Sequence, residues 1–417
     1  MTWPLRYAAL ALVAASSVSP QQAVRPAEPG VRFTPDLVQV DAVVTDAKGK
    51  QVTSLRPEDF EITEDGKHQT ITDFAYSAAG PATPRTVVFI ADTCDTSVYD
   101  RSIQTALEGF IRNHMRPGDR VSVLESLGGE GRSQQLTGDS EAAAAAAEAV
   151  GRRFVPGTPS LCREVALWFE YGQARERESA ARSDSEARYH GVASFNAVVS
   201  AVEGLAGTPG QKHVVLLSEL MGWTRYSRTT PAVQGLANRA NRAGVVLHFV
   251  DLSGFRAPPR IVGQSRWTSS SARPRSGAAE DAAAVRNPPG VTVTTVTAPQ
   301  ARGKAASYLS AVTGGIISQT VFDRPVPDVA TWRREVDASR AEFLKMSLDR
   351  IAANTEGHNW IGYRPPQRDV RKADRNFHQI KVTVRRRGLT VRSRGGYQGA
   401  LDHSPPAAPR SREELLR

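Results

Sequence analysis

The sequence is poor in cysteine and in aromatic residues. Its 417 residues include two cysteines, and Phe, Trp and Tyr together make up 7% of the chain. Two separated cysteines cannot build a thiolate zinc site, which needs several such ligands. The chain has no His-Glu-x-x-His sequence and no glycine-rich loop that ends in Gly-Lys-Ser. These absences exclude the common zinc and nucleotide-phosphate motifs.

The common hydrolase signals are also missing. Leu252-Ser253-Gly254 lacks the first glycine that a serine hydrolase elbow needs. The histidines are scattered, and we expect a structural role for each, including His378. The acidic pair Glu64 and Asp65 precedes a glycine, so turn formation explains it more simply than calcium binding. The sequence therefore predicts a protein that is not an enzyme.

No apolar run reaches the ~20 residues of a membrane-spanning helix. The N-terminus carries one positive charge in Met1–Arg6, an apolar run in Tyr7–Ala15 and small polar residues in Ser16–Pro20. This order is typical of a signal peptide. We expect residues 1–24 to be one, with a retained anchor as the alternative. The chain is then exported, to the periplasm, the outer surface or the medium, and nucleic acid is not an expected partner.

Export changes how the two cysteines, Cys94 and Cys162, are interpreted. Thiols persist poorly outside a reducing cytosol, so the pair is a possible disulfide. The alternative is two unpaired small hydrophobic residues. The distance between their Cα atoms decides between these two states.

The net charge of +10 is unevenly distributed, because residues 364–394 are strongly basic and include Arg385, Arg386 and Arg387. One interpretation is weak attraction to an anionic surface such as lipid head groups. The favoured interpretation is a solvated strand face, since basic residues alternate there with apolar ones.

Hydrophobic periodicity predicts an all-β unit followed by an α/β domain. Apolar residues alternate along Val38–Val44, and Asp65-Gly66 predicts a hairpin, so residues 31–78 form the β unit. Thr86–Ala91 is a continuous apolar run, as in a strand buried on both faces. Strands and amphipathic helices alternate from there over residues 84–322, which predicts a mostly parallel sheet with helices on both faces.

Within the α/β domain, residues 257–299 are rich in Ser, Ala, Arg, Pro and Gly, and we expect a disordered insertion there. A helix over 338–353 and C-terminal strands make up residues 335–400, and a disordered tail covers 401–417.

The N-terminal and C-terminal strands flank the α/β domain in sequence. We therefore expect them to pair into one β-sandwich beside it. Strands around Val40 and Val382 that lay in separate sheets on opposite sides of the domain would contradict this expectation.

Three sets of motifs, in this order and spacing, resemble the acidobacterial von Willebrand factor type A-related family of exported proteins. They are Val38–Phe74; the strand ending at Asp92 with Pro117–Val121 and Gly210–Ser218; and Gly362–Pro366 with Phe377–Val382 and Gly395–Tyr397. The resemblance implies a Rossmann-like domain that binds its ligand and metal at the carboxyl ends of the strands, where open α/β sheets generally bind ligands.

A domains hold a divalent cation with an Asp-x-Ser-x-Ser motif, and this sequence departs from that pattern. Asp92 matches the aspartate, but Cys94 and Thr96 stand at the two serine positions. A thiol is a poor ligand for magnesium. The adhesion site implied by the resemblance is therefore degenerate.

Magnesium or manganese at such a site would be held by Asp92, Thr96 and Glu219, with Ser194 as the nearest hydroxyl of the intermediate loop. Asp95 and Ser97 are substitute ligands. The alternative is that no metal binds, and that Asp92 and Ser97 simply cap the helix that follows.

The resemblance and the missing catalytic motifs together predict an extracytoplasmic, non-enzymatic binding or adhesion module. Its contact surface is formed by the loops after Asp92, around Ser194 and after Glu219. An unknown protein or a cell-surface polymer is the expected partner. The alternative is a metal-free structural or scaffold subunit of a cell-envelope assembly.

Overall fold

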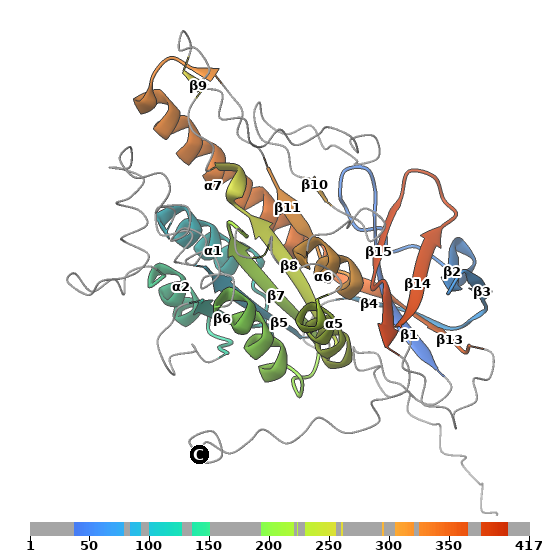
Figure 1. Cartoon of the computed structure of the whole chain (residues 1–417). Coiled ribbons are helices and arrows are strands. Elements are labelled where there is room, and N and C mark those ends of the chain that lie inside the picture. Colours follow the sequence, from blue (N-terminus) through green and yellow to red (C-terminus); the bar gives the residue numbers. More distant parts are fainter. Residues whose placement is uncertain are drawn as a thin grey trace, which may run out of the picture.

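The structure is a computed structural model of an α/β domain with a β-sandwich beside it (Figure 1). It describes residues 37–78, 84–92, 100–126, 136–150, 193–220, 223, 230–255, 260–261, 294–295, 305–320, 325–365 and 377–398. The predicted signal peptide, both cysteines and the predicted tail lie outside these residues. Within them, no helix combines the length and apolar character needed to cross a membrane.

The α/β domain is built on one sheet with the strand order β10-β11-β8-β7-β5-β6. Its strands are β5 (Arg85–Ala91), β6 (Arg120–Glu125), β7 (Gln211–Ser218), β8 (Val245–Asp251), β10 (Thr294–Thr295) and β11 (Ile317–Gln319). All neighbouring strands run parallel except β10, which is antiparallel to β11. This confirms the predicted mostly parallel sheet.

Helices cover both faces of this sheet, because its central strands are apolar on both sides. Phe89 of β5 points into one core and Ile90 into the other, and both are fully buried. The first core is covered by α1 (Asp100–His114), α2 (Ser140–Glu148) and α7 (Val329–Ala353). The second is covered by a helix over residues 193–204, α5 (Pro231–Ala243) and α6 (Ala305–Thr313).

Two expectations about this domain need correction. Helix α7 begins at Val329, well before the predicted start at residue 338, because Asp328 caps it and accepts a hydrogen bond from Thr331 N at 2.7 Å.

Most of the predicted insertion 257–299 lies outside the described residues. Near its two ends, however, β9 (Arg260–Ile261) pairs with β12 (Pro325–Val326), and β10 pairs with β11. Strand pairing satisfies backbone groups without large apolar side chains, so composition did not reveal it.

The β-sandwich has two sheets, with the strand orders β15-β1-β13-β4 and β16-β14-β2-β3. The strands are β1 (Val38–Thr45), β2 (Phe60–Glu64), β3 (Lys67–Gln69), β4 (Ile71–Ala78), β13 (Gly357–Tyr363), β14 (Phe377–Val384), β15 (Thr390–Ser393) and β16 (Gly396–Gln398). One-turn helices stand at Pro57–Asp59 before β2 and at Ser253–Phe255 after β8.

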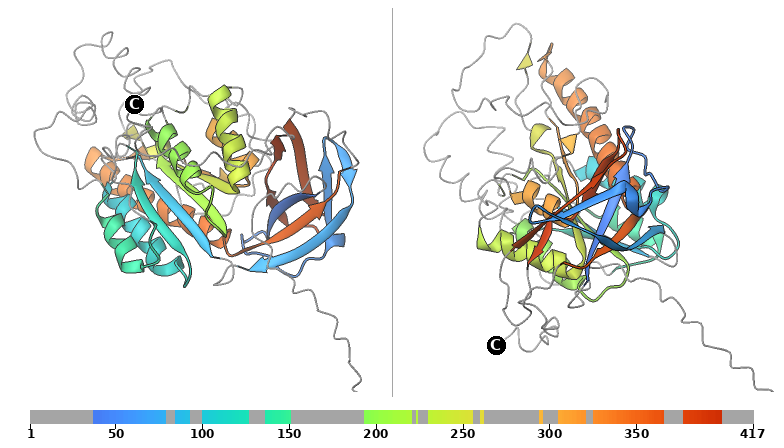
Figure 2. Two further views of the ribbon diagram at one scale, coloured as in Figure 1. Left: turned by 90° about the horizontal axis from the view of Figure 1, so that it is seen from below. Right: turned by 90° about the vertical axis from the view of Figure 1, so that its right-hand side faces the viewer.

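Strands from both ends of the chain pair within each sheet of the sandwich. β1 lies between β13 and β15, and β2 pairs with β14. Val40 and Val382 belong to different sheets, yet both point into the one apolar core that the sheets enclose. The predicted single sandwich beside the α/β domain is confirmed, as the two views of Figure 2 show.

The sandwich contacts the α/β domain at the amino ends of the parallel strands. Gln211, the first residue of β7, places its Nε2 3.0 Å from Nδ1 of His358 in β13. Arg392 of β15 donates from Nε to the carbonyl of Gly314, which precedes β11, at 3.0 Å. The carboxyl ends of the strands therefore lie at the edge away from the sandwich.

Candidate functional site

The carboxyl edge of the parallel sheet gathers buried acidic residues. Asp92 directly follows β5, Glu219 directly follows β7, and Asp251 is the last residue of β8. Their exposed fractions are 1%, 3% and 8%. Parallel strands all end at the same edge, so acids at their ends are brought together there. This edge is the candidate site.

Two serine hydroxyls converge on the Asp92 carboxylate. Ser126 Oγ donates to Oδ1 at 2.6 Å, and Ser218 Oγ donates to Oδ2 at 2.9 Å. Ser218 Oγ in turn accepts from Leu220 N at 3.0 Å. Leu220 has a φ of 52°, which is unusual for a non-glycine residue. The ends of β5, β6 and β7 are thus joined through one carboxylate.

The structure places the predicted ligands in different settings. Asp92 and Glu219 lie at the ends of the adjacent strands β5 and β7, as expected. The Ser194 hydroxyl instead accepts a hydrogen bond from Trp223 Nε1 at 2.9 Å, within the core under this edge. Thr96, Asp95 and Ser97 lie outside the described residues, as do Cys94 and Cys162, so their roles stay predictions.

The Asp92 carboxylate faces the ends of the neighbouring strands. Helix α1 starts at Asp100, whereas Asp92 remains hydrogen-bonded in the sheet through its backbone N–H to Leu217 O at 2.9 Å. Both Asp92 carboxylate oxygens accept serine hydroxyls from other strands. Residues 93–99, Ser97 among them, lie outside the described residues, so the alternative in which Asp92 and Ser97 cap the following helix stays a prediction.

Sequence reasoning did not identify Ser126 and Ser218 as partners of Asp92. Ser218 ends β7 and Ser126 follows β6 directly. Asp92 was singled out by its match to the family motif, but a simpler rule, a polar residue where a buried strand ends, applies equally to Asp92 and to both serines. Their hydroxyls were findable by applying that rule to every strand rather than to the motif strand alone.

The donor set fits a hard divalent cation. It consists only of oxygens, from the Asp92 carboxylate and the hydroxyls of Ser126 and Ser218, and magnesium prefers oxygen ligands. The distance of 2.9 Å between Ser218 Oγ and Asp92 Oδ2 matches neighbouring ligand oxygens in an octahedron with bonds of about 2.0–2.1 Å. Asp92, Ser126 and Ser218 would hold the ion.

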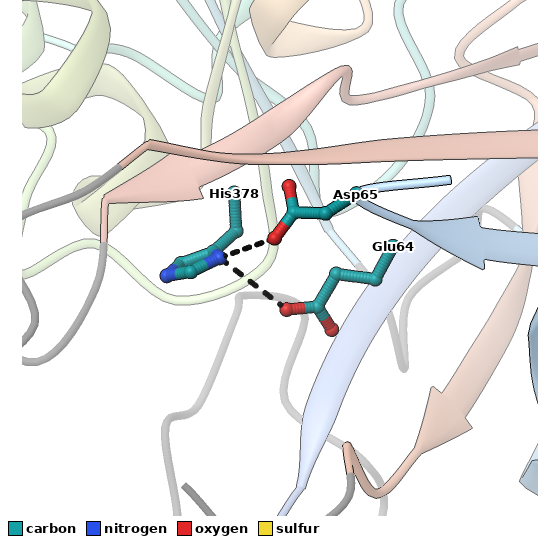
Figure 3. Close-up of side chains that lie close together, drawn as sticks. All are labelled: Glu64, Asp65 and His378. Carbon is teal, nitrogen blue, oxygen red and sulfur yellow. Dashed lines mark hydrogen bonds and ion pairs between the residues drawn. The ribbon is translucent and has the colours of Figure 1, made fainter. Parts of the chain in front are cut away.

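A second group of potential ligands lies in the β-sandwich (Figure 3). Glu64, Asp65 and His378 have ligand atoms within 4.8 Å of one another. His378 Nδ1 lies 2.7 Å from Asp65 Oδ2 and 3.7 Å from Glu64 Oε1. Tyr397 Oη donates to Glu64 Oε1 at 2.9 Å.

The contacts of this second group link the turn between β2 and β3 to strand β14. Asp65 occupies the turn with a φ of 50°. Its backbone N–H donates to Gln379 O at 2.9 Å, and its Oδ1 accepts from Gln379 N at 2.8 Å. The carboxylate is thus already bound by a backbone amide and an imidazole. We assign these residues a structural role, as the sequence led us to expect for His378.

Comparison with known proteins adds little to this description. No family model matches the sequence, and no curated protein matches it. Among solved structures, one that is similar is the crystal structure of an aerotolerance-related membrane protein from Bacteroides fragilis with multiple mutations to serines. The two chains are 9% identical, the match covers 64% of this chain and 98% of that chain, and the TM-score is 0.30. At that TM-score the likeness carries no argument about function.

Proposed function

We propose that this chain is an extracytoplasmic, non-enzymatic binding module of the von Willebrand factor A type. In this proposal the carboxyl edge around Asp92 holds magnesium or manganese and contacts a protein or a cell-surface polymer through it. The observation that carries the proposal is the convergence of Asp92, Ser126 and Ser218 from three adjacent strands. Export rests on the signal-peptide pattern of residues 1–24.

Charge supports a cation at this edge. Asp92, Glu219 and Asp251 are acids buried close to the ends of β5, β7 and β8. Buried carboxylates are costly unless hydrogen bonds or cations stabilise them. A divalent cation held by Asp92 and Glu219 would supply the positive charge, and Thr96, which follows β5 in the sequence, would complete the ligand set.

The alternative is a metal-free scaffold subunit. The two serine hydroxyls already satisfy both oxygens of Asp92, and Cys94 replaces the first serine of the usual motif. In this alternative the carboxylate only joins the strand ends. Metal dependence separates the two functions.

The test is the thermal unfolding midpoint of the mature protein in magnesium, in manganese and in a chelator. A ligand that binds only the folded state stabilises it by about 2.7 kcal/mol at a hundred times its dissociation constant. We expect a rise of several degrees for the wild type and none for Asp92→Asn, which keeps the shape of the side chain but lowers its affinity for a cation.

Asp251→Asn is the matched control, because it makes the same change at the same edge. Asp251 accepts hydrogen bonds from Ser253 N at 3.0 Å and from Gln319 Nε2 at 3.2 Å, whereas Asp92 accepts from Ser126 and Ser218. This variant should keep the metal-induced rise. A wild-type midpoint that stays the same across millimolar metal rejects the cation site and leaves the scaffold alternative.

A further inference from the structure

A cavity lies where the sandwich meets the amino ends of β7 and β8, at the opposite edge from Asp92. Its volume is about 60 Å³. One water needs roughly 10–15 Å³ of such space, so the cavity has room for a few waters or one ion of comparable size. It is lined from the α/β domain by Lys212 and Gly314, and from the sandwich by Asp41, Arg392 and Arg394.

The lining is positively charged, since Lys212, Arg392 and Arg394 face it with Asp41 as the one carboxylate among the lining residues. Asp41 Oδ1 lies 3.5 Å from His358 Nε2, which is its partner. Arg394 and Lys212 are 7% and 5% exposed. A buried cation is costly unless an anion pairs with it.

Backbone carbonyls are the described hydrogen-bond partners of all three cations. Lys212 Nζ donates to Thr208 O at 2.8 Å, Arg392 Nε to Gly314 O at 3.0 Å, and Arg394 Nη1 to Asn241 O at 3.2 Å. Asn241 is in the last turn of α5 and Gly314 follows α6. A helix C-terminus carries about half a negative charge, so these contacts neutralise the cations only in part.

Burial dominates the pKa values of the three cations, and the charge of Asp41 partly offsets it for Arg394. Burial lowers the pKa of Lys212 and of Arg394, and it lowers the pKa of Arg392 to about 9. Each guanidinium uses one of its nitrogens in the bonds above, and a guanidinium has five N–H donors. Donors that fit an oxyanion are therefore left at the cavity.

His248 and His213, which also line the cavity, carry no negative charge that could balance the cations. Ile316 N donates to His248 Nδ1 at 3.2 Å, so the proton of neutral His248 is on Nε2, which donates to His213 Nδ1 at 3.2 Å. His213 Nε2 then donates to Gln211 Oε1 at 3.4 Å. Burial lowers the pKa of His213 to about 3. These imidazoles are neutral, and their protons are used within the chain of hydrogen bonds.

We propose that this cavity binds a small oxyanion, of the chemistry of phosphate or sulfate, between the α/β domain and the sandwich. Arg392 and Arg394 approach from the sandwich and Lys212 from β7, so the anion bridges the two parts. Planar guanidinium groups match the oxygen geometry of such anions. The bound anion completes the charge balance of the interface and stabilises the folded chain.

The experiment measures the thermal unfolding midpoint of the mature protein in millimolar sodium phosphate or sodium sulfate, with sodium chloride at the same ionic strength as the reference. At ten times the dissociation constant we expect a rise of roughly 3–5 °C. The rise should be absent in Arg392→Gln. It should persist in Arg387→Gln, which removes an exposed arginine just before β15.

A midpoint that phosphate and sulfate raise no more than chloride does would overturn the proposal, and so would an equal rise in Arg392→Gln. Calorimetric titration of the wild type with phosphate keeps the test independent of how stable the variant is. One site per chain is expected, and an absence of binding heat at two temperatures rejects the site. Asp92→Asn should respond to phosphate like the wild type, which separates this cavity from the cation site.

Discussion

At the scale of single residues, the ion pair of Arg85 and Asp119 is the most deeply buried charge contact described. The two side chains are 2% and 4% exposed. Arg85 Nε donates to Asp119 Oδ2 at 3.0 Å, and Nη1 donates to Thr355 Oγ1 at 2.8 Å. Arg85 thereby connects β5 to the residues that lead into β13.

Arg85→Met should lower the free energy of unfolding by roughly 3–5 kcal/mol, because it leaves Asp119 as a buried carboxylate without its cation. Urea unfolding followed by circular dichroism measures the loss. Arg112→Met is the matched control, since Arg112 pairs with Glu108 on the surface of α1, and exposed pairs contribute little. Equal losses of unfolding free energy in both variants would show that the burial of the Arg85 ion pair does not determine its contribution to stability.

At the scale of secondary-structure elements, Gly315 sets how closely the β11 segment approaches β8. A Cβ atom at this position would lie 1.8 Å from Leu247 O. No side chain fits at that distance, and the obstacle is backbone, which cannot rotate away. The register of Ile317 against Phe249 depends on this approach.

Gly315→Ala should therefore destabilise the protein by roughly 1–3 kcal/mol, as overpacking does, or more if β11 separates from β8. Gly235→Ala provides the contrast. It lies within α5, and its nearest atom is 3.8 Å away in the flexible Arg239 side chain. That change should stabilise the chain by roughly 0.5–1 kcal/mol through helix propensity. Thermal unfolding of both variants tests the difference in sign.

At the scale of the whole molecule, the two edges of the parallel sheet gather different charged groups. Asp92, Glu219 and Asp251 are buried at the carboxyl edge, and Lys212, Arg392 and Arg394 line the cavity at the amino edge, where the sandwich packs. The hydrogen-bonded chain through His248, His213, Gln211 and His358 crosses that second edge from one domain to the other. Its links through His248 and His213 hold only while these two imidazoles are neutral.

Stability should fall as the pH falls from about 6.5 towards 3. The folded-state pKa of His213 is lowered from 6.5 to about 3 by burial, with Arg85, Arg392 and His358 adding positive charge. In this range the unfolded state binds the proton and the folded state does not, so stability is lost at about 1.4 kcal/mol per pH unit for such a histidine. The pKa of His248 is lowered as well, by burial first and by His213 next.

Urea unfolding at a series of pH values measures this slope. His213→Gln should flatten it relative to the wild type. His68→Gln should leave it unchanged, since the His68 side chain is 72% exposed and meets Glu61 at the surface. A wild-type slope that survives in His213→Gln would mean that other groups cause the acid sensitivity.

The sequence by itself determined the class of fold and most of its elements. Apolar runs such as Thr86–Ala91 can be buried on both faces only in a sheet covered by helices, and period-two runs such as Val38–Val44 only in a half-buried sheet. Asp92 and Glu219 were identified through the family resemblance, and each stands where a buried strand ends. Helix α5 begins at Pro231 and is followed by Gly244 in a left-handed conformation, so both of its ends are marked locally in the sequence.

Only the tertiary structure decided which side chains meet. Ser126 and Ser218 reach Asp92 because β6 and β7 flank β5, and strand order is not encoded in any local pattern. The cavity beside Arg392 exists because β15 returns to the amino ends of strands that lie far away in sequence. Contacts of this kind depend on how layers pack, whereas periodicity reports only which face of an element is buried. That physical difference is why the fold was readable from the sequence and the partners within each site were not.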